Sequence, residues 1–193
     1  MKLKICGLQT LQDINYVNKA EVDFAGFVFT PHRQQITLKT AQKLKSALNP
    51  KIKSVGVFVG ESYEFIKNIV DQKIVDIVQF HGEQEYALPC PTIKAFKMRT
   101  KLDIKPTSCN FALFDSFQEN TPGSSGKTFD WRLIENYADK PFFLAGGINI
   151  TNVRKALKLN PYCIDISSGA EEHGEKSFEK IMALSYLCKA WRN

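Results

Sequence analysis

Short apolar runs recur about every 20 to 30 residues along the chain, and they are continuous rather than alternating with polar residues. Continuous apolar runs are typical of strands that a parallel sheet buries on both faces. Eight runs are predicted to be strands, and they cover residues 3–7, 23–29, 54–59, 76–80, 92–96, 111–115, 142–147 and 163–167. Neighbouring parallel strands need a crossover connection, so the segments between the runs decide the fold.

Most of these segments carry apolar residues at helical spacing. The predicted helices have as their apolar stripes Leu11, Ile14 and Val17; Ala41, Leu44, Ala47 and Leu48; Phe65, Ile66, Ile69 and Val70; Trp131, Ile134 and Tyr137; Val153, Ala156 and Leu157; and Phe178, Ile181, Leu184, Cys188 and Trp191. Thr151 is the expected cap of the helix that carries Val153. The segment after the fourth run is too short and proline-rich for a long helix. Residues 99–110 are expected to be irregular, with one turn of helix.

Repeated alternation of strand and helix predicts an α/β protein with a closed (β/α)8 (TIM) barrel, at the small end of the size range of that fold. An open doubly wound sheet is the alternative, but no G-x-G-x-x-G follows the first strand. No linker divides the sequence, so residues 1–193 are expected to form a single domain.

Polar and reactive side chains collect where the predicted strands end, which is where such barrels place their chemistry. They are Cys6, Thr30, His32, Arg33, Gln79, His81, Asp115, Ser116, Asp165, Ser167 and Ser168. Taken alone, Cys6 fits a buried apolar cysteine and Asp115 fits a structural ion-pair partner. Placed across one barrel mouth, a thiol and a carboxyl suit a proton-transfer reaction.

Glycine-containing loops follow the seventh and eighth strands, at AGGIN (145–149) and DISSGAEEHGE (165–175). Their backbone N–H groups could cradle a phosphate, although glycines also serve plain tight turns. Barrels of this class often use these two loops together for phosphate, so an anionic substrate is predicted. A Gly/Ser-rich stretch at 121–131 is expected to be a flexible loop or a lid, and its glycine spacing excludes a P-loop.

The net charge of +6 admits nucleic-acid binding, but the basic residues are scattered and equally suit an anionic small-molecule site. The cysteine count of five is odd and includes no C-x-x-C pair, which argues against a disulfide framework and indicates a reducing cytoplasm. No signal peptide or membrane-length apolar stretch is recognised. Cys6, His32 and His81 match no standard ligand spacing, so no metal is predicted.

The chain resembles the N-(5′-phosphoribosyl)anthranilate isomerase family over nearly its whole length. The motifs that carry the resemblance are KICGL (4–8), GFVF (26–29), VGVFV (55–59), DIVQFHG (76–82), GKTFDW (126–131), LAGGI (144–148) with NV (152–153), and DISSGAE (165–171). The resemblance implies an Amadori rearrangement in L-tryptophan biosynthesis, with 1-(o-carboxyphenylamino)-1-deoxyribulose 5-phosphate as product. It also implies no cofactor or metal and either a monomer or a homodimer.

The resemblance assigns a role to each candidate residue. Cys6 would be the general base and Asp115 the general acid, with its pKa raised by desolvation. The residues implied in substrate binding are Arg33, Gln79, His81 and Asp165, and those implied in phosphate binding are Gly146, Gly147, Ser168 and Gly169.

Two departures from the family pattern stand out. The family usually shows Ser-x-Arg after the second strand, whereas this chain reads His32-Arg33-Gln34, so the arginine is one position early. The loop after the sixth strand reads Gly123-Ser124-Ser125-Gly126 in place of Gly-Gly-Thr-Gly. Another sugar-phosphate barrel remains an alternative, such as a ribulose-phosphate epimerase or an indole-glycerol-phosphate synthase, for which Lys94 and Lys97 are weak candidate lysines. The third possibility, after the isomerase and another sugar-phosphate enzyme, is a basic barrel that binds a partner without catalysis.

Overall fold

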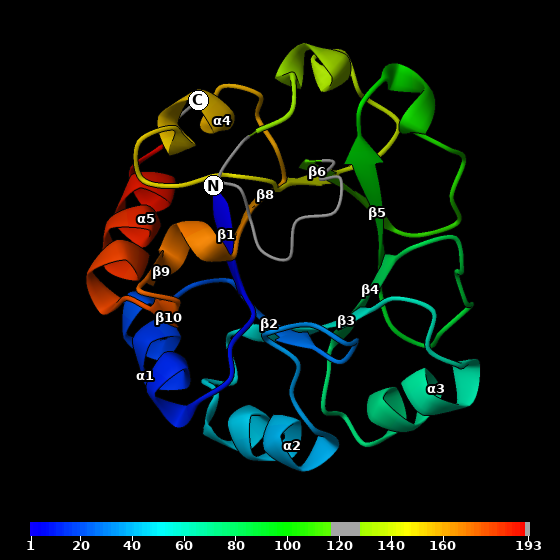
Figure 1. Cartoon of the computed structure of the whole chain (residues 1–193), viewed down its shortest axis with the longest axis vertical. Helices are drawn as coiled ribbons and strands as arrows, with labels where there is room; N and C mark the ends of the chain where they lie inside the picture. The colour runs from blue at the N-terminus through cyan, green and yellow to red at the C-terminus, as the bar shows by residue number, and fades with distance from the viewer. Residues whose placement is uncertain (117–127, 192–193) are drawn as a thin grey trace.

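Eight parallel strands close into a barrel in which β1 pairs with both β2 and β8 (Figure 1). The computed structural model describes residues 1–116 and 128–191. In chain order the strands are β1 (Lys2–Cys6), β2 (Phe24–Val28), β3 (Lys53–Phe58), β4 (Ile77–His81), β5 (Thr92–Met98), β6 (Phe111–Ser116), β7 (Phe142–Leu144) and β8 (Cys163–Ile166). The predicted (β/α)8 barrel is therefore confirmed, and the open sheet is wrong.

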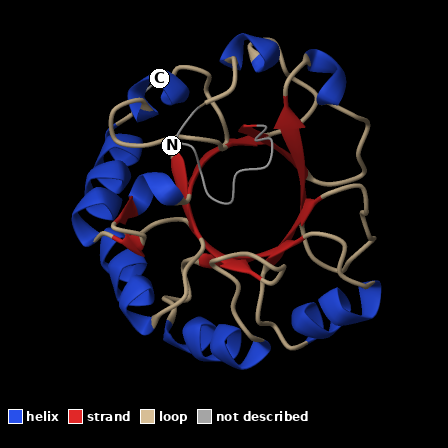
Figure 2. Ribbon diagram, viewed as in Figure 1, coloured by secondary structure: helices blue, strands red, loops and turns tan. Residues whose placement is uncertain are grey.

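The helices lie outside the ring of strands, as Figure 2 shows. They are α1 (Leu11–Ala20), α2 (Leu38–Ala47), α3 (Tyr63–Asp71), α4 (Val153–Leu157) and α5 (Phe178–Ala190), with short 3-10 helices η1 (Lys101–Asp103), η2 (Trp131–Ile134) and η3 (Ser168–Ala170). A hairpin of β9 (Glu171–Glu172) and β10 (Glu175–Lys176) precedes α5. The segment between β4 and β5 is fully described and holds no helix, as predicted.

The longer helices begin at hydroxyl residues whose side chains accept a backbone N–H from the first turn. These caps are Thr10, Thr37, Ser62 and Ser177. The cap predicted for α4 is wrong, because the Thr151 hydroxyl donates instead to Oδ1 of Asn149 at 2.6 Å. The helix begins after Asn152, whose Nδ2 donates to the carbonyl of Gly147 at 3.0 Å and ties the helix start to the preceding glycine turn.

The helix predicted from Trp131, Ile134 and Tyr137 is present only as the single 3-10 turn η2. Tyr137 packs edge-on against Phe114 of β6 with their ring centroids 4.8 Å apart, and it also contacts Phe142 of β7. The strands already provide a packing surface for this aromatic ring without a longer α-helix. Tertiary packing therefore outweighs the helical propensity of this segment.

Side chains alternate between the inside and the outside of the barrel along each strand. The outward ones pack against the helices. Those pointing inward near the N-terminal strand ends form an apolar cluster that includes Phe24, Val55, Ile77, Ile93, Leu113, Phe143 and Cys163. This cluster fills the N-terminal half of the barrel interior, so the C-terminal half is left for polar groups.

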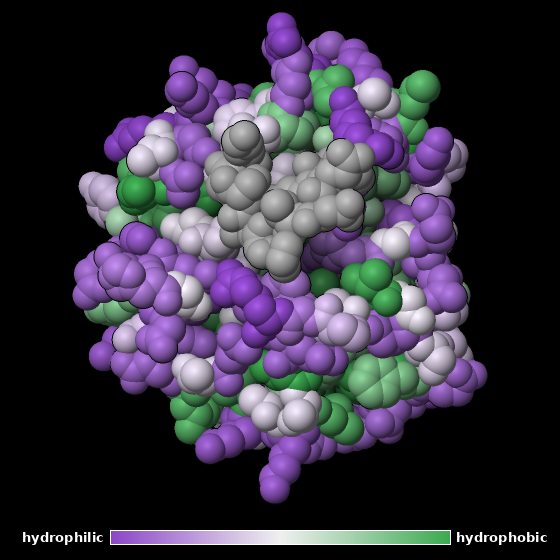
Figure 3. Space-filling view, in the orientation of Figure 1, coloured by the Kyte–Doolittle hydropathy of each residue, from purple (hydrophilic) through white to green (hydrophobic). Residues whose placement is uncertain are grey.

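The exterior is largely polar on the face seen in Figure 3, where hydrophilic side chains predominate and apolar ones form small separated areas. Among the described residues, no helix combines the length and the apolar character that crossing a bilayer requires.

Candidate active site

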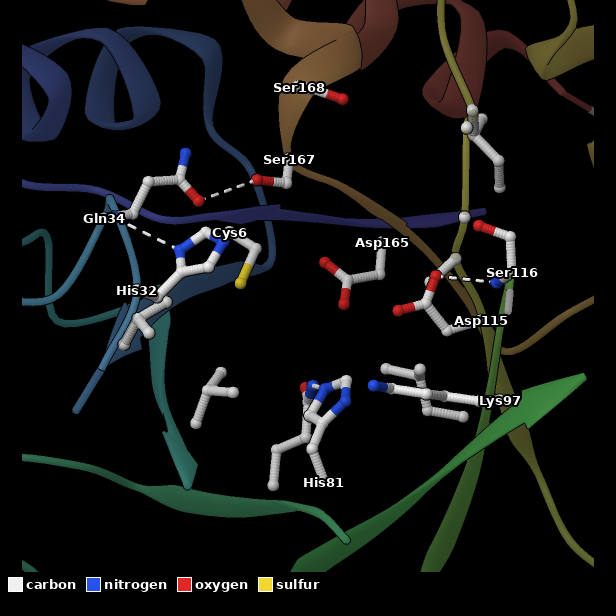
Figure 4. A pocket seen from close by; sticks show the side chains of 18 of the residues that line it. Cys6, His32, Gln34, His81, Lys97, Asp115, Ser116, Asp165, Ser167 and Ser168 are labelled. Atoms are coloured by element: carbon white, nitrogen blue, oxygen red, sulfur yellow. Dashed lines mark hydrogen bonds between the residues drawn. The ribbon is translucent and has the colours of Figure 1, made fainter. Parts of the chain in front are cut away.

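A pocket of about 380 Å³ opens at the C-terminal ends of the strands, within the size range of small-molecule sites. Every residue predicted for the site lines it, although they come from six strand ends and from segments far apart in sequence. Figure 4 shows the sulfur of Cys6 and the carboxylates of Asp115 and Asp165 directed into the same space. The structure thus brings together the groups that the strand-end rule selected.

Cys6 is the last residue of β1, and its thiol faces the pocket. Its neighbour in the β1–β2 register is Gly26, and a Cβ there would lie only 2.8 Å from the sulfur, so the glycine makes room for the thiol. Burial raises the pKa of Cys6, the ammonium of Lys4 opposes the shift, and the net pKa lies above the usual value. The free protein therefore holds Cys6 mainly as a thiol at neutral pH.

Asp115 ends the apolar stretch of β6 and accepts a hydrogen bond from the backbone N–H of Ser116 at 2.8 Å. Burial, together with repulsion from the Asp165 carboxylate, raises its pKa to about 6. The pKa increase expected from the apolar surroundings is confirmed. A carboxyl with this pKa can carry a proton near neutral pH, as a general acid requires.

A buried polar layer of Lys4, Gln79 and Asp165 lies between the apolar filling and the pocket. Nζ of Lys4 donates to Oε1 of Gln79 at 2.7 Å and to Oδ2 of Asp165 at 2.8 Å. Burial alone lowers the pKa of Lys4, but Asp165 and Cys6 raise it further than burial lowers it, so the lysine is charged. Lys4 was not among the sequence candidates. Its place two residues before Cys6, on the same inward face of β1, is the signal that could have found it.

The two carboxylate oxygens of Asp165 have different surroundings. Oδ2 pairs with Lys4, whereas Oδ1 is buried and has no hydrogen-bond partner among the described residues. A buried acceptor without a partner is costly, so its presence at a pocket wall indicates a position that a ligand hydroxyl can satisfy.

Backbone N–H groups of Gly146, Gly147, Ser168 and Gly169 form an amide cluster at the ends of β7 and β8, on the pocket wall. Gly146 and Gly147 have positive φ angles of 83° and 66°, and the described chain offers none of the four N–H groups an acceptor. A Cβ at Gly146 would lie 2.3 Å from the backbone nitrogen of Ser116, so this turn accepts only glycine. Successive free N–H groups of this kind bind anions.

The two loops of the amide cluster touch at Gly169, and this contact supports a prediction. A Cβ at Gly169 would lie 1.9 Å from the carbonyl oxygen of Ile148, so Gly169→Ala must push the loops apart. We expect the variant to bind inorganic phosphate at least about tenfold more weakly, measured by calorimetry. The control is Ser46→Ala, which shortens an exposed side chain on α2, away from the pocket. Unchanged phosphate affinity in Gly169→Ala would contradict the anion-binding role.

Arg33 lines the pocket, but its guanidinium is already paired. Nη2 of Arg33 lies 2.6 Å from Oε2 of Glu171. The other oxygen of this carboxylate, Oε1, accepts hydrogen bonds from Nε2 of Gln34 and, at 2.8 Å, from Nζ of Lys176. The arginine is held at the rim by this acidic residue, which sequence reasoning did not select. Burial and the Arg33 charge lower the pKa of the adjacent His32.

His81 is neutral in this environment. Burial and, to a smaller extent, the nearby ammonium groups of Lys4 and Lys97 together lower its pKa to about 3. Its Nε2 lies 2.5 Å from Nε2 of Gln79, so the two side chains form one hydrogen-bonded surface on β4. His81 can therefore donate or accept hydrogen bonds in the pocket, but it is a poor acid–base group at neutral pH.

Two further sequence expectations concern metals and the loop after β6. In residues 1–116 and 128–191, no three His, Cys, Asp or Glu side chains lie close enough to hold a metal ion. Most of the loop or lid predicted at 121–131 belongs to residues 117–127, which lie outside the described residues.

Known proteins match this chain over most of its length. The family model for N-(5'phosphoribosyl)anthranilate (PRA) isomerase matches residues 3–185. The isomerase of Endomicrobium trichonymphae is 41% identical over an alignment 190 residues long that covers 94% of each chain. The solved isomerase of Thermus thermophilus has a TM-score of 0.86 at 30% identity and covers 100% of both chains.

Two further solved isomerases share the fold and the sequence pattern. The structure from Thermotoga maritima has a TM-score of 0.87 at 31% identity, with 99% of this chain and 100% of that chain covered. Another, with a TM-score of 0.83 at 29% identity, covers 99% of this chain and 100% of that chain, and it is a complex with reduced 1-(o-carboxyphenylamino)-1-deoxyribulose 5-phosphate. With the family model and the relatives in agreement, the chain belongs to the family of N-(5'-phosphoribosyl)anthranilate isomerases.

Proposed function

We propose that the pocket converts N-(5-phosphoribosyl)anthranilate into 1-(o-carboxyphenylamino)-1-deoxyribulose 5-phosphate, with Cys6 as general base and Asp115 as general acid. The observation that carries the proposal is the pairing of a carboxyl of raised pKa with a thiol across a pocket whose far wall is an anion-binding amide cluster. Membership of the isomerase family makes this aldose–ketose rearrangement the expected reaction.

Ring opening is the first step. Asp115 gives its proton to the furanose oxygen, the bond from that oxygen to C1′ breaks, and the nitrogen lone pair forms a Schiff base with C1′. The ring oxygen becomes a hydroxyl group. Because burial keeps Asp115 protonated to a higher pH than an exposed aspartate, the acid is available near neutrality.

Proton removal from C2′ is the second step. The Cys6 thiolate takes this proton, and the electrons of the C–H bond move toward the Schiff base to give an enolamine. The 2′-hydroxyl then loses its proton while C1′ gains one, so the ketone forms with no net change of atoms or electrons. The charged Lys4 beneath Cys6 stabilises the thiolate in this step.

The other walls of the pocket bind the substrate. The phosphate is proposed to accept hydrogen bonds from the amide cluster, and a sugar hydroxyl to donate to Oδ1 of Asp165. Gln79 and His81 form the floor. The resemblance assigns Arg33 to the anthranilate carboxylate, which requires its ion pair with Glu171 to open.

The proposed partner is the small-molecule substrate, with no nucleic acid or membrane involved. The five cysteines are all free, which supports a reducing cytoplasmic location. A monomer or a homodimer is proposed, and the isomerase of Thermotoga maritima is described as dimeric.

The direct test follows the loss of anthranilate-type fluorescence from freshly prepared phosphoribosylanthranilate, with EDTA present and no metal added. We expect wild-type protein to consume the substrate far faster than its spontaneous decay. Consumption no faster than the protein-free reaction would reject the proposed function.

The two pKa values predict an unusual pH profile. The reaction needs Asp115 protonated and Cys6 ionised, but their pKa values, about 6 and above the usual thiol value, lie in the opposite order. Below about pH 6, kcat/KM should rise tenfold per pH unit as thiolate forms. From there to the Cys6 pKa it should stay flat, because each gain in thiolate is matched by a loss of protonated Asp115.

Steady-state kinetics from pH 5 to pH 10 check this profile. The substrate phosphate also ionises near pH 6, so a 31P titration of the free substrate is the control. The same tenfold rise per pH unit below about pH 6 should appear in kcat, which reports the enzyme–substrate complex. A steady decline of kcat/KM between pH 6 and pH 8 would contradict the assignment of Cys6 as the base.

A further inference from the structure

The Ser116 hydroxyl is a buried polar group on the pocket wall that the proposed mechanism does not use. Ser116 is the last residue of β6, lines the pocket and is 8% exposed. Its Oγ has no hydrogen-bond partner among the described residues, whereas the large majority of buried polar side-chain atoms in folded proteins have one. The chain therefore holds an unsatisfied hydroxyl group beside the pocket.

An unsatisfied hydroxyl lowers the stability of the folded protein, so its position indicates a second use. Taking a hydroxyl out of water without forming a new hydrogen bond is unfavourable, and alanine would avoid this penalty. An acceptor on a ligand that reaches Oγ removes the penalty in the bound state only. Oδ1 of Asp165 is also unsatisfied, but a carboxylate can only accept, whereas the Ser116 hydroxyl can donate to an anionic oxygen.

The turn at Gly146 lies opposite Ser116. Strands β6 and β7 pair in register up to Phe114 and Leu144, so Ser116 and Gly146 lie opposite each other two positions later. A Cβ at Gly146 would lie only 2.8 Å from Oγ of Ser116. Figure 4 shows the hydroxyl directed toward this segment after β7. The glycine therefore leaves Oγ uncovered on the side of the amide cluster.

The acid and the amide cluster lie on either side of Ser116. Its backbone N–H donates to Oδ1 of Asp115 at 2.8 Å, and its side chain contacts Gly146, which belongs to the amide cluster. In the proposed substrate, only C4′ and C5′ separate the furanose oxygen from the phosphate ester oxygen. A substrate whose ring oxygen meets Asp115 therefore brings its phosphate toward the wall where the Ser116 hydroxyl lies.

We propose that Ser116 is a substrate-binding residue whose hydroxyl donates a hydrogen bond to the phosphate, beside the backbone donors of the amide cluster. The identity of the ligand rests on the proposed function. Hydrogen bonds to an ionised acceptor are stronger than those between neutral groups, so one hydroxyl contributes measurably to the affinity. The phosphate then contacts β6 as well as the loops after β7 and β8. Unlike the backbone donors, the hydroxyl can be removed by one side-chain replacement.

The test compares phosphate affinity and thermal stability in one variant. Calorimetry with inorganic phosphate at neutral pH should show about tenfold weaker binding to Ser116→Ala. The Tm of the ligand-free variant should equal that of wild type or exceed it, because the variant no longer buries an unsatisfied hydroxyl.

Ser185→Ala is the matched control. Ser185 is also buried and does not line the pocket, but its Oγ donates to the carbonyl of Ala20 at 2.7 Å. The same replacement there should lower the Tm and leave phosphate affinity unchanged, which is the opposite pattern to the one expected for Ser116→Ala.

Steady-state kinetics separate a phosphate contact from an effect on the acid. Ser116→Ala keeps the backbone N–H that donates to Asp115. We expect the KM for phosphoribosylanthranilate to rise about tenfold and kcat to change less than about twofold, since the phosphate takes no part in bond breaking. An unchanged phosphate affinity with a lower kcat would place the hydroxyl on the ring oxygen and overturn the proposal.

The phosphate titration needs no turnover, so this proposal and the proposed function can fail separately. Wild-type protein that binds phosphate but does not consume phosphoribosylanthranilate would reject the proposed function, while Ser116→Ala would still decide the role of the hydroxyl. Phosphate affinity equal to that of wild type in Ser116→Ala, or no phosphate binding by wild type, would reject that role. A weaker affinity accompanied by a lower Tm would mean that the hydroxyl serves the fold and would also reject it.

Discussion

Asp115→Asn should lower kcat/KM about a thousandfold and, at neutral pH, stabilise the folded protein. The loss of activity follows because the amide cannot give a proton to the furanose oxygen. The gain in stability follows because folding forces a carboxylate into a buried site, where its pKa is about 6 rather than 3.8. Asparagine keeps the shape of the side chain without the charge.

The sign of the stability effect depends on pH. Between pH 3.8 and about 6 the folded protein binds more protons at Asp115 than the unfolded chain, so the free energy of unfolding falls as the pH rises through this window. The pKa difference corresponds to about 3 kcal/mol, which partial solvent exposure reduces to about 2 kcal/mol at pH 7. At pH 3 the variant and wild type should be equally stable.

Urea unfolding at pH 3 and pH 7, with kinetics at pH 7, checks both halves of this prediction. Glu135→Gln, which neutralises an exposed carboxylate beside η2, is the control and should change neither quantity. Cys6→Ser should lose activity to a similar degree without the pH-dependent stabilisation. An Asp115→Asn variant that is inactive and also less stable at pH 7 would mean that the carboxylate serves the fold.

Lys4→Met should lower the free energy of unfolding by about 3 to 5 kcal/mol. Lys4 is 0% exposed, and its ammonium is the ion-pair partner of Asp165, which is 7% exposed. Removing the ammonium leaves a buried carboxylate without a counter-charge and removes the donor to Gln79 as well. Methionine has a similar length and apolar character, so the loss reports charge rather than volume.

A double variant separates the ion pair from packing. Lys4→Met combined with Asp165→Asn should recover most of the stability lost in Lys4→Met alone, because no charge is then left unpaired. Urea unfolding of the two single variants and the double variant gives the coupling. A loss below about 1 kcal/mol in Lys4→Met, or additive losses in the double variant, would show that the polar layer does not depend on this pair.

The barrel could be predicted from sequence because its signals are local. Each strand is a continuous apolar run, and Cys6 and Asp115 stand out because each is a reactive residue that ends such a run. The loops at Gly146 and Gly169 were found for the same reason, since glycine marks close approaches of the backbone. These features need no knowledge of distant contacts.

The features that could not be found from the sequence depend on distant contacts or on which residues of a strand point into the barrel. Lys97 lies beyond the predicted end of the fifth run, whereas β5 continues to Met98 and turns the lysine inward. Arg33 and Glu171 are 138 positions apart, and their ion pair forms only because the hairpin after β8 folds back toward the β2 loop. Nothing local in the sequence specifies that meeting.

The amide cluster also bears on how this barrel could acquire new substrates. Its N–H groups belong to the backbone, so most single amino-acid replacements elsewhere in the pocket leave them in place. The opposite half is made of side chains such as Val57, Val59 and Lys97, which replacement changes directly. Evolution or design can therefore explore new aglycones while the phosphate end continues to anchor the ligand, and we expect altered specificity to remain among phosphorylated sugars.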